Sequence, residues 1–419
     1  MSPDVTVCGL GYVGLALARE ASAAGLTVLG YDIDESIVDG LRAGRSHVDD
    51  VYDEDVAAMA ATGFTATGDP AALGASPVVV ICVPTPLDRH GEPDLGAVFG
   101  AVTGVANRLE PGRLVILEST SYPGTTEEVV LPILERASGL TAGVDFHLAF
   151  SPERIDPGNR TRSVAKTPKV VGGFTAACAD RAAGFYGRFV ENVVQARGTR
   201  EAEMAKLLEN TYRHVNIGLV NELAQLCHEL GIDVWNVIEC AGTKPFGFQP
   251  FEPGPGVGGH CIPVDPRYLA YKAEQVGFRP RLINAAELIN AGMPAYVVDR
   301  CAELLPLDGA EVVLLGVTYK ADVADLRMSP AFGVARELRL RGASVSYHDP
   351  YAEGFAVDRR PVRRRADLAV ALRDADLAIL LQKHDAYDSD RLLGARCRVF
   401  DARGLLAEQE RADEPIETL

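Results

Sequence analysis

The sequence predicts an α/β protein in which two Rossmann-like doubly wound domains are joined by a central region of long helices. Strand-length apolar runs alternate with helical stretches in the first part of the chain, and the same alternation returns after about residue 307. Between these parts, apolar residues recur at helical spacing over a much longer stretch. We therefore expect an N-terminal domain over residues 1–198, a central helical domain over 199–306 and a C-terminal domain over 307–419.

Composition and charge limit the classes of partner. The chain has 419 residues, of which 47% are hydrophobic, enough for sizeable cores. Its net charge of −17 argues against binding nucleic acid or an anionic membrane, so an anionic small molecule would need locally placed Lys or Arg. The eight cysteines lack metal-binding spacing, no apolar run approaches the roughly 20 residues of a membrane helix, and no signal peptide is apparent. These features favour a cytoplasmic protein.

The first strand, expected over residues 5–8, leads through a glycine-rich turn into a helix over 15–24. The turn has the pattern G-x-G-x-x-G and consists of Gly9, Leu10, Gly11, Tyr12, Val13 and Gly14. Asp32 follows at the end of the second strand, where its carboxylate can bond both ribose hydroxyls and would repel a 2′-phosphate. The pattern therefore predicts an NAD site rather than an NADP site. The alternative is a tight strand-to-helix turn without a ligand.

Three further strand-like runs of the first domain end in polar residues. Residues 77–83, 114–117 and 146–150 are followed by Thr85, Thr120 and Glu153, respectively. Ligands of open α/β sheets bind beyond the carboxyl ends of the strands, which is where these side chains are expected. Alone, Glu153 would more often be a solvated loop carboxylate.

Helical signals follow these strands. Thr125 and Glu128 have the spacing of a capping box, which predicts a structural role for the threonine. A helix is expected from about Glu201 to Leu230, with Lys206 and Asn210 four residues apart and therefore on one face. Solvated charge is the usual reason for a helix lysine, but this helix interleaves polar with apolar residues. It is also a reasonable element for dimerisation.

The stretch from Pro253 to Pro266 is rich in glycine and proline, which excludes a regular helix or central strand. It predicts a tightly specified loop that presents Cys261 just ahead of a helix with Asp265 as its N-cap and Pro266 as its first residue. At that position the helix dipole favours the thiolate. For the cysteine alone, the alternative is a role as a small buried hydrophobe.

The last part of the chain has the pattern of a second doubly wound domain, without a G-x-G-x-x-G turn of its own. A strand is expected over residues 311–315, and Lys320 and Arg327 lie beyond its end. An anionic ligand would sit there. An NAD site combined with a nucleophilic cysteine suggests oxidation through a thiohemiacetal and a thioester.

At this point the sequence resembles the UDP-glucose/GDP-mannose dehydrogenase family over nearly its whole length. The matching segments are Gly9–Gly14, Cys82–Pro86, Glu118–Thr120, Ser151–Glu153, Glu203–Lys206 with Asn210, Gly258–Cys261 with Asp265, and Gly316–Arg327. Members of this family oxidise the C6 hydroxyl of a nucleotide-activated hexose to a carboxylate, using two NAD per turnover. The resemblance implies an NAD-binding N-terminal domain, a central domain with the cysteine loop and a dimer interface, and a nucleotide-sugar-binding C-terminal domain.

The resemblance also implies roles for individual residues. Lys206 and Asn210 would stabilise the developing C6 oxyanion, Cys261 would trap the C6 aldehyde, and three further residues would position or activate water: Thr120, Glu153 and Asp265. NAD would contact Gly9, Gly11, Tyr12, Val13, Gly14, Asp32, Thr85, Thr120 and Arg327. The sugar nucleotide would contact Glu153, Arg154, Lys206, Asn210, Pro250, Phe251, Gly254, Gly258 and Lys320. No metal is implied.

Departures from the family pattern bear on the substrate. His260 and Val264 stand where UDP-glucose members commonly have Ser and a Lys that contacts a cofactor phosphate. Pro157 replaces a second Glu after Glu153. The run from Lys244 to Phe248 is similar to the subgroup acting on UDP-N-acetylhexosamines, while glucose on UDP or dTDP remains a candidate. Two alternatives to the whole assignment are a non-catalytic sugar-nucleotide binding protein and a two-electron hydroxyacid dehydrogenase.

Overall fold

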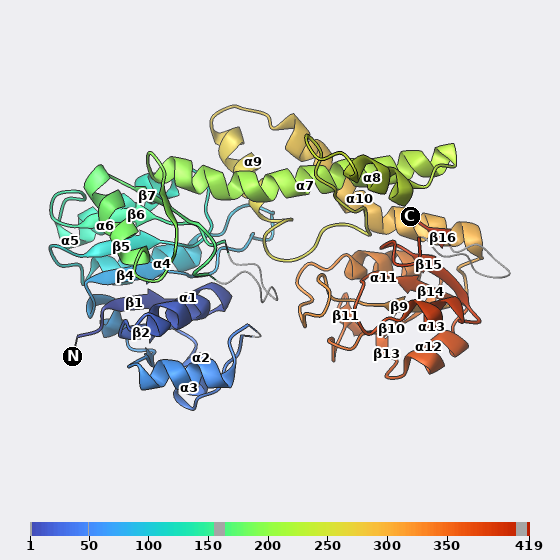
Figure 1. The fold of residues 1–419 in the computed structure, drawn as a ribbon, viewed down its shortest axis with the longest axis horizontal. Helices are drawn as coiled ribbons and strands as arrows, with labels where there is room; N and C mark the ends of the chain where they lie inside the picture. Colours follow the sequence, from blue (N-terminus) through green and yellow to red (C-terminus); the bar gives the residue numbers. More distant parts are fainter. Residues whose placement is uncertain (1, 49, 155–163, 408–416) are drawn as a thin grey trace. The chain divides into compact units, whose positions relative to one another are not determined.

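The computed structural model describes residues 2–48, 50–154, 164–407 and 417–419, and Pro157 lies outside them (Figure 1). The chain forms two compact units. Unit 1 consists of residues 1–209 and 267–278, and unit 2 of residues 210–266 and 279–419. The three-domain boundaries predicted from the sequence remain a prediction.

Unit 1 is built on an eight-stranded sheet with the order β3-β2-β1-β4-β5-β6-β7-β8. The strands are β1 (Val5–Cys8), β2 (Val28–Tyr31), β3 (Thr65–Thr67), β4 (Val78–Ile81), β5 (Leu114–Leu117), β6 (His147–Phe150), β7 (Lys169–Gly173) and β8 (Val193–Gln195). All neighbours pair in parallel except β6 and β7. The central strands β1, β4 and β5 are buried throughout, as continuous apolar runs of a parallel sheet should be.

Helices follow most strands of unit 1, which gives the doubly wound pattern predicted from the sequence. They are α1 (Tyr12–Ala23), α2 (Glu35–Arg42), α3 (Asp53–Ala61), the 3₁₀ turn η1 (Pro70–Gly74), α4 (Gly96–Ala106), the π-helical turn η2 (Thr126–Val130), α5 (Leu131–Ser138) and α6 (Ala176–Tyr186). Strand order changes direction between β1 and β4, so the ligand crevice of this sheet lies at their carboxyl ends.

Long helices occupy the middle of the chain, as predicted. They are α7 (Thr199–Leu230), α8 (Val234–Gly242), α9 (Asp265–Gln275) and α10 (Arg281–Leu304). The unbroken α7 passes from unit 1 into unit 2 at Glu209 and Asn210. α9 begins at Asp265 itself, one residue before the start predicted from the sequence.

Unit 2 contains a second, all-parallel sheet of six strands in the order β13-β10-β9-β14-β15-β16. Its elements are β9 (Glu311–Leu315), α11 (Ala331–Leu340), β10 (Ser344–His348), the β11–β12 hairpin (Ala356–Val357 and Arg360–Pro361), β13 (Arg363–Arg364), α12 (Leu368–Asp374), β14 (Leu377–Leu380), α13 (Ser389–Leu393), β15 (Arg398–Asp401) and β16 (Glu417–Thr418). The second doubly wound half predicted from the sequence is therefore present.

Alternate residues of β9 point to two separate cores on the two faces of this sheet. Val312 and Leu314 belong to a core that includes Val334 of α11. Val313 and Leu315, which point the other way, belong to a core that includes Leu372 of α12. Covering both faces with helices leaves the strand ends as the place for a ligand.

The capping box expected at Thr125 and Glu128 is wrong. Thr125 has helical backbone angles and makes no side-chain cap; its hydroxyl donates to the carbonyl oxygen of Tyr122. The free N–H groups at this helix start are capped instead by Glu203 of α7, which accepts from Gly124 N (2.6 Å) and Thr126 N (2.8 Å). A distant carboxylate has replaced the local cap, so the spacing signal was misleading.

Candidate active site

The glycine-rich turn of unit 1 has the geometry that a dinucleotide requires. Gly9 has φ +92°, which favours glycine. A Cβ on Gly14 would lie 1.8 Å from the carbonyl oxygen of Gly9, so only glycine lets α1 pack this closely on β1. A Cβ on Gly11 would meet no atom within 4 Å, which leaves the approach to the start of α1 open. The first turn of α1 has no side-chain cap and no acidic residue to compete with a phosphate.

Asp32 lies directly after β2, beside this turn. Its Oδ2 accepts from Leu10 N at 2.8 Å and its Oδ1 accepts from Asp34 N at 3.0 Å. A carboxylate can accept about four hydrogen bonds, so two of its acceptor positions are left for hydroxyl groups. Asp32 is partly exposed, and the geometry fits an adenosine ribose bearing two free hydroxyls.

Thr85, Thr120 and Glu153 follow β4, β5 and β6, three neighbouring strands of the unit 1 sheet. Their strands are parallel, so the three residues share the carboxyl edge, as predicted. Thr85 is buried, and its carbonyl oxygen accepts from the hydroxyl of Tyr268 at 3.0 Å. Thr120 is partly exposed.

Lys206 of α7 reaches this same edge of unit 1. Its Nζ lies 3.4 Å from Oε2 of Glu153, and both side chains are buried. Desolvated charges of opposite sign stabilise each other, which explains how a lysine can sit inside this helix–sheet interface. Arg154, the next residue, pairs instead with Glu209 at 2.5 Å and donates to Pro168 O at 2.7 Å.

A buried ion pair that sequence reasoning missed lies beneath these residues. The Lys169 ammonium of β7 contacts the Glu118 carboxylate and donates to Pro152 O at 3.2 Å. Glu118 also accepts from the hydroxyl of Tyr186 at 2.8 Å. Burial and the neighbouring Glu118 carboxylate hold the pKa of Tyr186 well above its usual range, so it remains a donor. One ammonium thus ties Glu118, two residues before Thr120, to Pro152, which immediately precedes Glu153.

In unit 2, Asn210 and Asp265 form a direct contact. Asn210 Nδ2 donates to Asp265 Oδ2 at 2.5 Å, and Asp265 is buried. The N–H groups of Val264 and Asp265 donate to Cys261 O at 3.1 and 2.9 Å, forming a turn that runs from the cysteine into α9. Cys261 therefore precedes the positive end of this helix, as predicted, and is half-buried.

The glycines ahead of Cys261 are packed against the segment that follows β9. A Cβ on Gly258 or Gly259 would lie 2.6 or 2.7 Å from the Tyr319 side chain, and Gly259 has φ +88°. The N–H of Gly259 donates to Arg327 O at 2.9 Å. Burial, then the charge of Arg327, lowers the pKa of His260, which keeps this imidazole neutral beside the thiol.

Arg403 is a second residue that sequence reasoning missed. Its Nη1 lies 2.7 Å from where a Cβ on Gly254 would stand, so the guanidinium packs on the loop predicted to hold the sugar nucleotide. Burial lowers the pKa of Arg403, although Glu252 and Asp401 favour its charged form. Of the other predicted substrate contacts in unit 2, Pro250 is exposed, whereas Phe251 and Lys320 are partly buried. Arg327 pairs with Asp325 at 2.6 Å.

The candidate residues thus fall into two groups. Thr120, Glu153 and Lys206 belong to unit 1, whereas Asn210, Cys261 and Asp265 belong to unit 2. The other predicted residues up to Arg154 lie in unit 1, and those from Pro250 to Arg327 lie in unit 2. α7 carries Lys206 and Asn210 one turn apart. Within the described ranges, no group of His, Cys, Asp and Glu residues is arranged to hold a metal ion.

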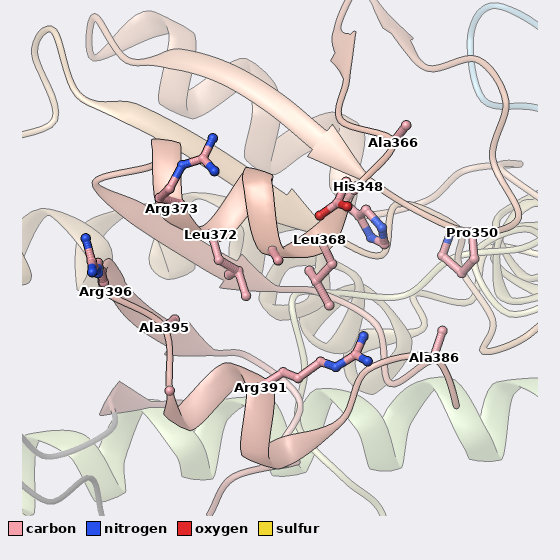
Figure 2. Close-up of a pocket in the computed structure, with 13 residues that line it drawn as sticks. His348, Pro350, Ala366, Leu368, Leu372, Arg373, Ala386, Arg391, Ala395 and Arg396 are labelled. Atoms are coloured by element: carbon pink, nitrogen blue, oxygen red, sulfur yellow. The ribbon is translucent and has the colours of Figure 1, made fainter.

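A separate cleft of about 1000 Å³ lies in unit 2 (Figure 2). It is lined by residues of α12, α13, the end of β10 and the neighbouring loops, including Leu368, Arg391 and His348. No residue predicted as a site residue is among those that line it, so the cleft lies outside the candidate site. No helix in the described part of the chain is long and apolar enough to cross a membrane.

Comparison with known families gives three consecutive matches. The models of the UDP-glucose/GDP-mannose dehydrogenase family match with the NAD binding domain at residues 3–190, the central domain at 200–292 and the UDP binding domain at 313–408. The candidate residues fall within these three matches.

Individual relatives agree with this. The chain is 40% identical to a UDP-N-acetyl-D-glucosamine 6-dehydrogenase of Pseudomonas aeruginosa, over 83% of this chain and 82% of the relative. It is 35% identical to a UDP-N-acetyl-D-mannosamine dehydrogenase of Yersinia pestis, over 91% and 94%. Among solved structures, a UDP-D-ManNAc dehydrogenase from Pyrococcus horikoshii superposes with a TM-score of 0.89 at 32% identity, covering 99% and 98%. A UDP-glucose dehydrogenase from Pyrobaculum islandicum gives 0.85 at 29% identity, covering 96% and 94%.

Proposed function

Because the chain belongs to the UDP-glucose/GDP-mannose dehydrogenase family, we propose that it oxidises the C6 hydroxyl of a UDP-N-acetylhexosamine to a carboxylate through a thioester on Cys261. The enzyme class is that of an NAD-dependent nucleotide-sugar dehydrogenase, which converts a UDP-sugar to the uronic acid. The observation that supports the covalent route is the position of the half-buried Cys261 thiol just ahead of α9. A turn closed on Cys261 O and the bond from Gly259 N to Arg327 O hold the loop there.

NAD fits the described turn of unit 1. The open approach over Gly11, the uncapped start of α1 and the spare acceptor positions of Asp32 suit the pyrophosphate and the ribose. When bound, this cofactor supplies the hydride acceptor for both oxidation steps. Gly9, Tyr12, Val13, Gly14, Thr85, Thr120 and Arg327 complete the proposed contacts.

Lys206 is assigned to the first oxidation. As the C6 hydroxyl loses its proton, the fixed ammonium of Lys206 stabilises the alkoxide, and the Asn210 amide one turn along α7 donates to the same oxygen. Glu153, 3.4 Å from Lys206, keeps that ammonium in place, and a water on Glu153 or Thr120 takes the proton.

Cys261 is assigned to the second oxidation. Its thiolate adds to the C6 aldehyde and forms a C–S bond, and the resulting thiohemiacetal loses a hydride to give the thioester. Water then attacks the acyl carbon, the C–S bond breaks, and the carboxylate and the free thiol are released. Asp265, whose carboxylate holds Asn210 at 2.5 Å, is the proposed base for this water.

The substrate loop supports a nucleotide diphosphate. Pro250, Phe251, Gly254 and Gly258 form the loop, and cationic Lys320 and Arg403 of unit 2 offset the two phosphate charges in a chain that is otherwise strongly acidic. Arg154 of unit 1 is also a proposed contact of the sugar nucleotide. The relatives named for UDP-N-acetylhexosamines favour an N-acetylated sugar, and glucose on UDP or dTDP is the second candidate.

A homodimer through the central helices is proposed from the surface of α7. This helix exposes a stripe of apolar side chains at helical spacing: Met204, Leu208, Leu219, Leu223, Leu226 and Leu230. Leu208, for example, is 60% exposed. Exposed apolar side chains that line up on one helix face are a feature of surfaces that bind another protein. The eight free cysteines favour the cytoplasm as its location.

The test is to count NADH formed per sugar consumed, with purified protein, NAD and a panel of UDP-, dTDP- and GDP-sugars. Two NADH per UDP-N-acetylhexosamine supports the proposal, one indicates a two-electron dehydrogenase, and none across the panel indicates a binding protein. Cys261→Ala should abolish carboxylate formation, and Cys240→Ala, which removes an exposed thiol, is the matched control. Sustained two-NADH turnover by Cys261→Ala would refute the covalent route.

A further inference from the structure

Unit 2 repeats an arrangement seen at the proposed NAD site, in which a glycine follows one strand and an aspartate follows the neighbouring strand. Gly316, with φ +77°, follows β9 as Gly9 follows β1, and its N–H donates to His348 O at 3.0 Å as that of Gly9 donates to Tyr31 O at 2.8 Å. Asp349 follows β10 as Asp32 follows β2. Its Oδ2 accepts from Val317 N at 2.6 Å, the counterpart of the Leu10 contact.

The two carboxylates differ in the number of partners. Asp32 accepts two backbone hydrogen bonds and is partly exposed. Asp349 is buried and accepts from four N–H groups, those of Val317, Thr318, Tyr351 and Ala352, and from His384 Nε2 at 3.2 Å. Five donors exceed the usual acceptor capacity, so no hydroxyl of a ribose can be added. Burial alone would raise its pKa, but His384 and the N–H groups lower the pKa of Asp349 to about 2.

His384 is fully buried and has one protonation pattern that satisfies its neighbours. Its Nδ1 accepts from the N–H of Asp322 at 2.9 Å, so this nitrogen carries no proton. The proton is therefore on Nε2, which donates to Asp349. Asp322 has φ +58°, an uncommon conformation for a non-glycine residue, and His384 holds it there.

Residues around His384 hold the same segment. Gln382 Nε2 donates to Tyr319 O at 2.8 Å, and Asp385 N donates to Asp322 Oδ1 at 3.0 Å. With the bond from Asp322 N to His384, three hydrogen bonds thus join the segment after β14 to residues 317–327. Residues 317–327 include Lys320, and through Tyr319 and Arg327 they contact Gly258 and Gly259 ahead of Cys261.

We propose that His384 and Asp349 are positioning residues that hold residues 317–327, and through them the glycine turn before Cys261, in the shape that receives the sugar nucleotide. The inference rests on the proposed function. It assigns to the second strand-end carboxylate a role different from that of Asp32: it organises a substrate segment and does not bind a cofactor.

The test compares His384→Leu with His384→Asn, two side chains of similar size. Asn can return an acceptor to the N–H of Asp322, and Leu cannot. We expect His384→Leu to raise the KM for the sugar nucleotide by about tenfold, because the partly buried N–H of Asp322 loses its acceptor and Asp349 loses a donor, while the KM for NAD changes less than about twofold. His384→Asn should recover most of the loss.

Hydrogen exchange measured by mass spectrometry provides a readout besides activity. The amides of residues 317–327 should exchange faster in His384→Leu than in wild type, whereas those around Asp32 should not change. Unchanged exchange of the segment would overturn the positioning role. Faster exchange with an unchanged KM for the sugar nucleotide would overturn its link to substrate. Failure of the proposed function is distinguished from both, because the wild type would then form no NADH.

Discussion

Because the Lys169–Glu118 pair is buried, we expect the loss of its ammonium to lower the stability of unit 1 strongly. Lys169→Met removes the ammonium and leaves the Glu118 carboxylate, 2% exposed, with the hydrogen bond that the Tyr186 hydroxyl donates to it. Breaking a buried pair from one side typically costs about 3–5 kcal/mol, because the surviving charge stays desolvated. For a unit of this size that corresponds to a fall in melting temperature of roughly 10 °C.

Calorimetry is the appropriate assay, since the two units need not unfold in one transition. Trp235, the only tryptophan, lies in unit 2 and would not report on Lys169. The matched control is the double variant Glu118→Gln with Lys169→Met, in which no charge is left buried and the amide oxygen still accepts from Tyr186. We expect it to recover more than half of the loss.

Two results would contradict this reasoning. A loss below about 1 kcal/mol in Lys169→Met would place the pair among weak surface ion pairs. A double variant no more stable than the single one would mean that the ammonium acts through packing and not through the Glu118 charge. Because Lys169 also holds Pro152, kcat should fall in both variants.

Three further predictions concern other parts of the chain. Asp32→Asn should weaken NAD binding by about 1–3 kcal/mol and reduce discrimination against NADP, measured as KM for each cofactor; unchanged selectivity would count against the ribose contact. Burial raises the pKa of Glu203 from 4.5 to about 7. In the folded protein Glu203 therefore keeps its proton to higher pH than in the unfolded chain. Its contribution to the free energy of unfolding falls by about 3 kcal/mol as pH rises from 4.5 to 7. Glu203→Gln should remove that slope from the melting temperature, and a wild-type-minus-variant difference that is constant with pH would contradict it. Leu208→Asp combined with Leu226→Asp should give a monomer by light scattering, and an unchanged mass would exclude this face as the interface.

Local patterns in the sequence were sufficient for much of the fold. The glycine turn, Asp32 and the helix predicted from about Glu201 to Leu230 each depend on residues close in the chain, and the structure contains them, with α7 starting two residues earlier, at Thr199. The second doubly wound half was also correctly predicted from its strand and helix periodicity.

Contacts between distant residues could not be predicted in this way. Glu118 and Lys169 are 51 residues apart, and nothing in either neighbourhood distinguishes them from solvated charges. Glu203 caps a helix start 77 residues away, which displaced the local Thr125 cap. His384 and Asp349, 35 residues apart, become neighbours only because β10 and β14 flank β9.

The saturated Asp349 bears on the order of events in the proposed turnover. Of the two strand-end carboxylates described, Asp32 has acceptor positions left for a ribose and Asp349 has none, so we expect the dinucleotide to bind at Asp32. On the proposed covalent route, NADH would then have to leave this site and a second NAD bind to it between the two oxidation steps. The half-oxidised sugar would stay attached to Cys261 during this exchange.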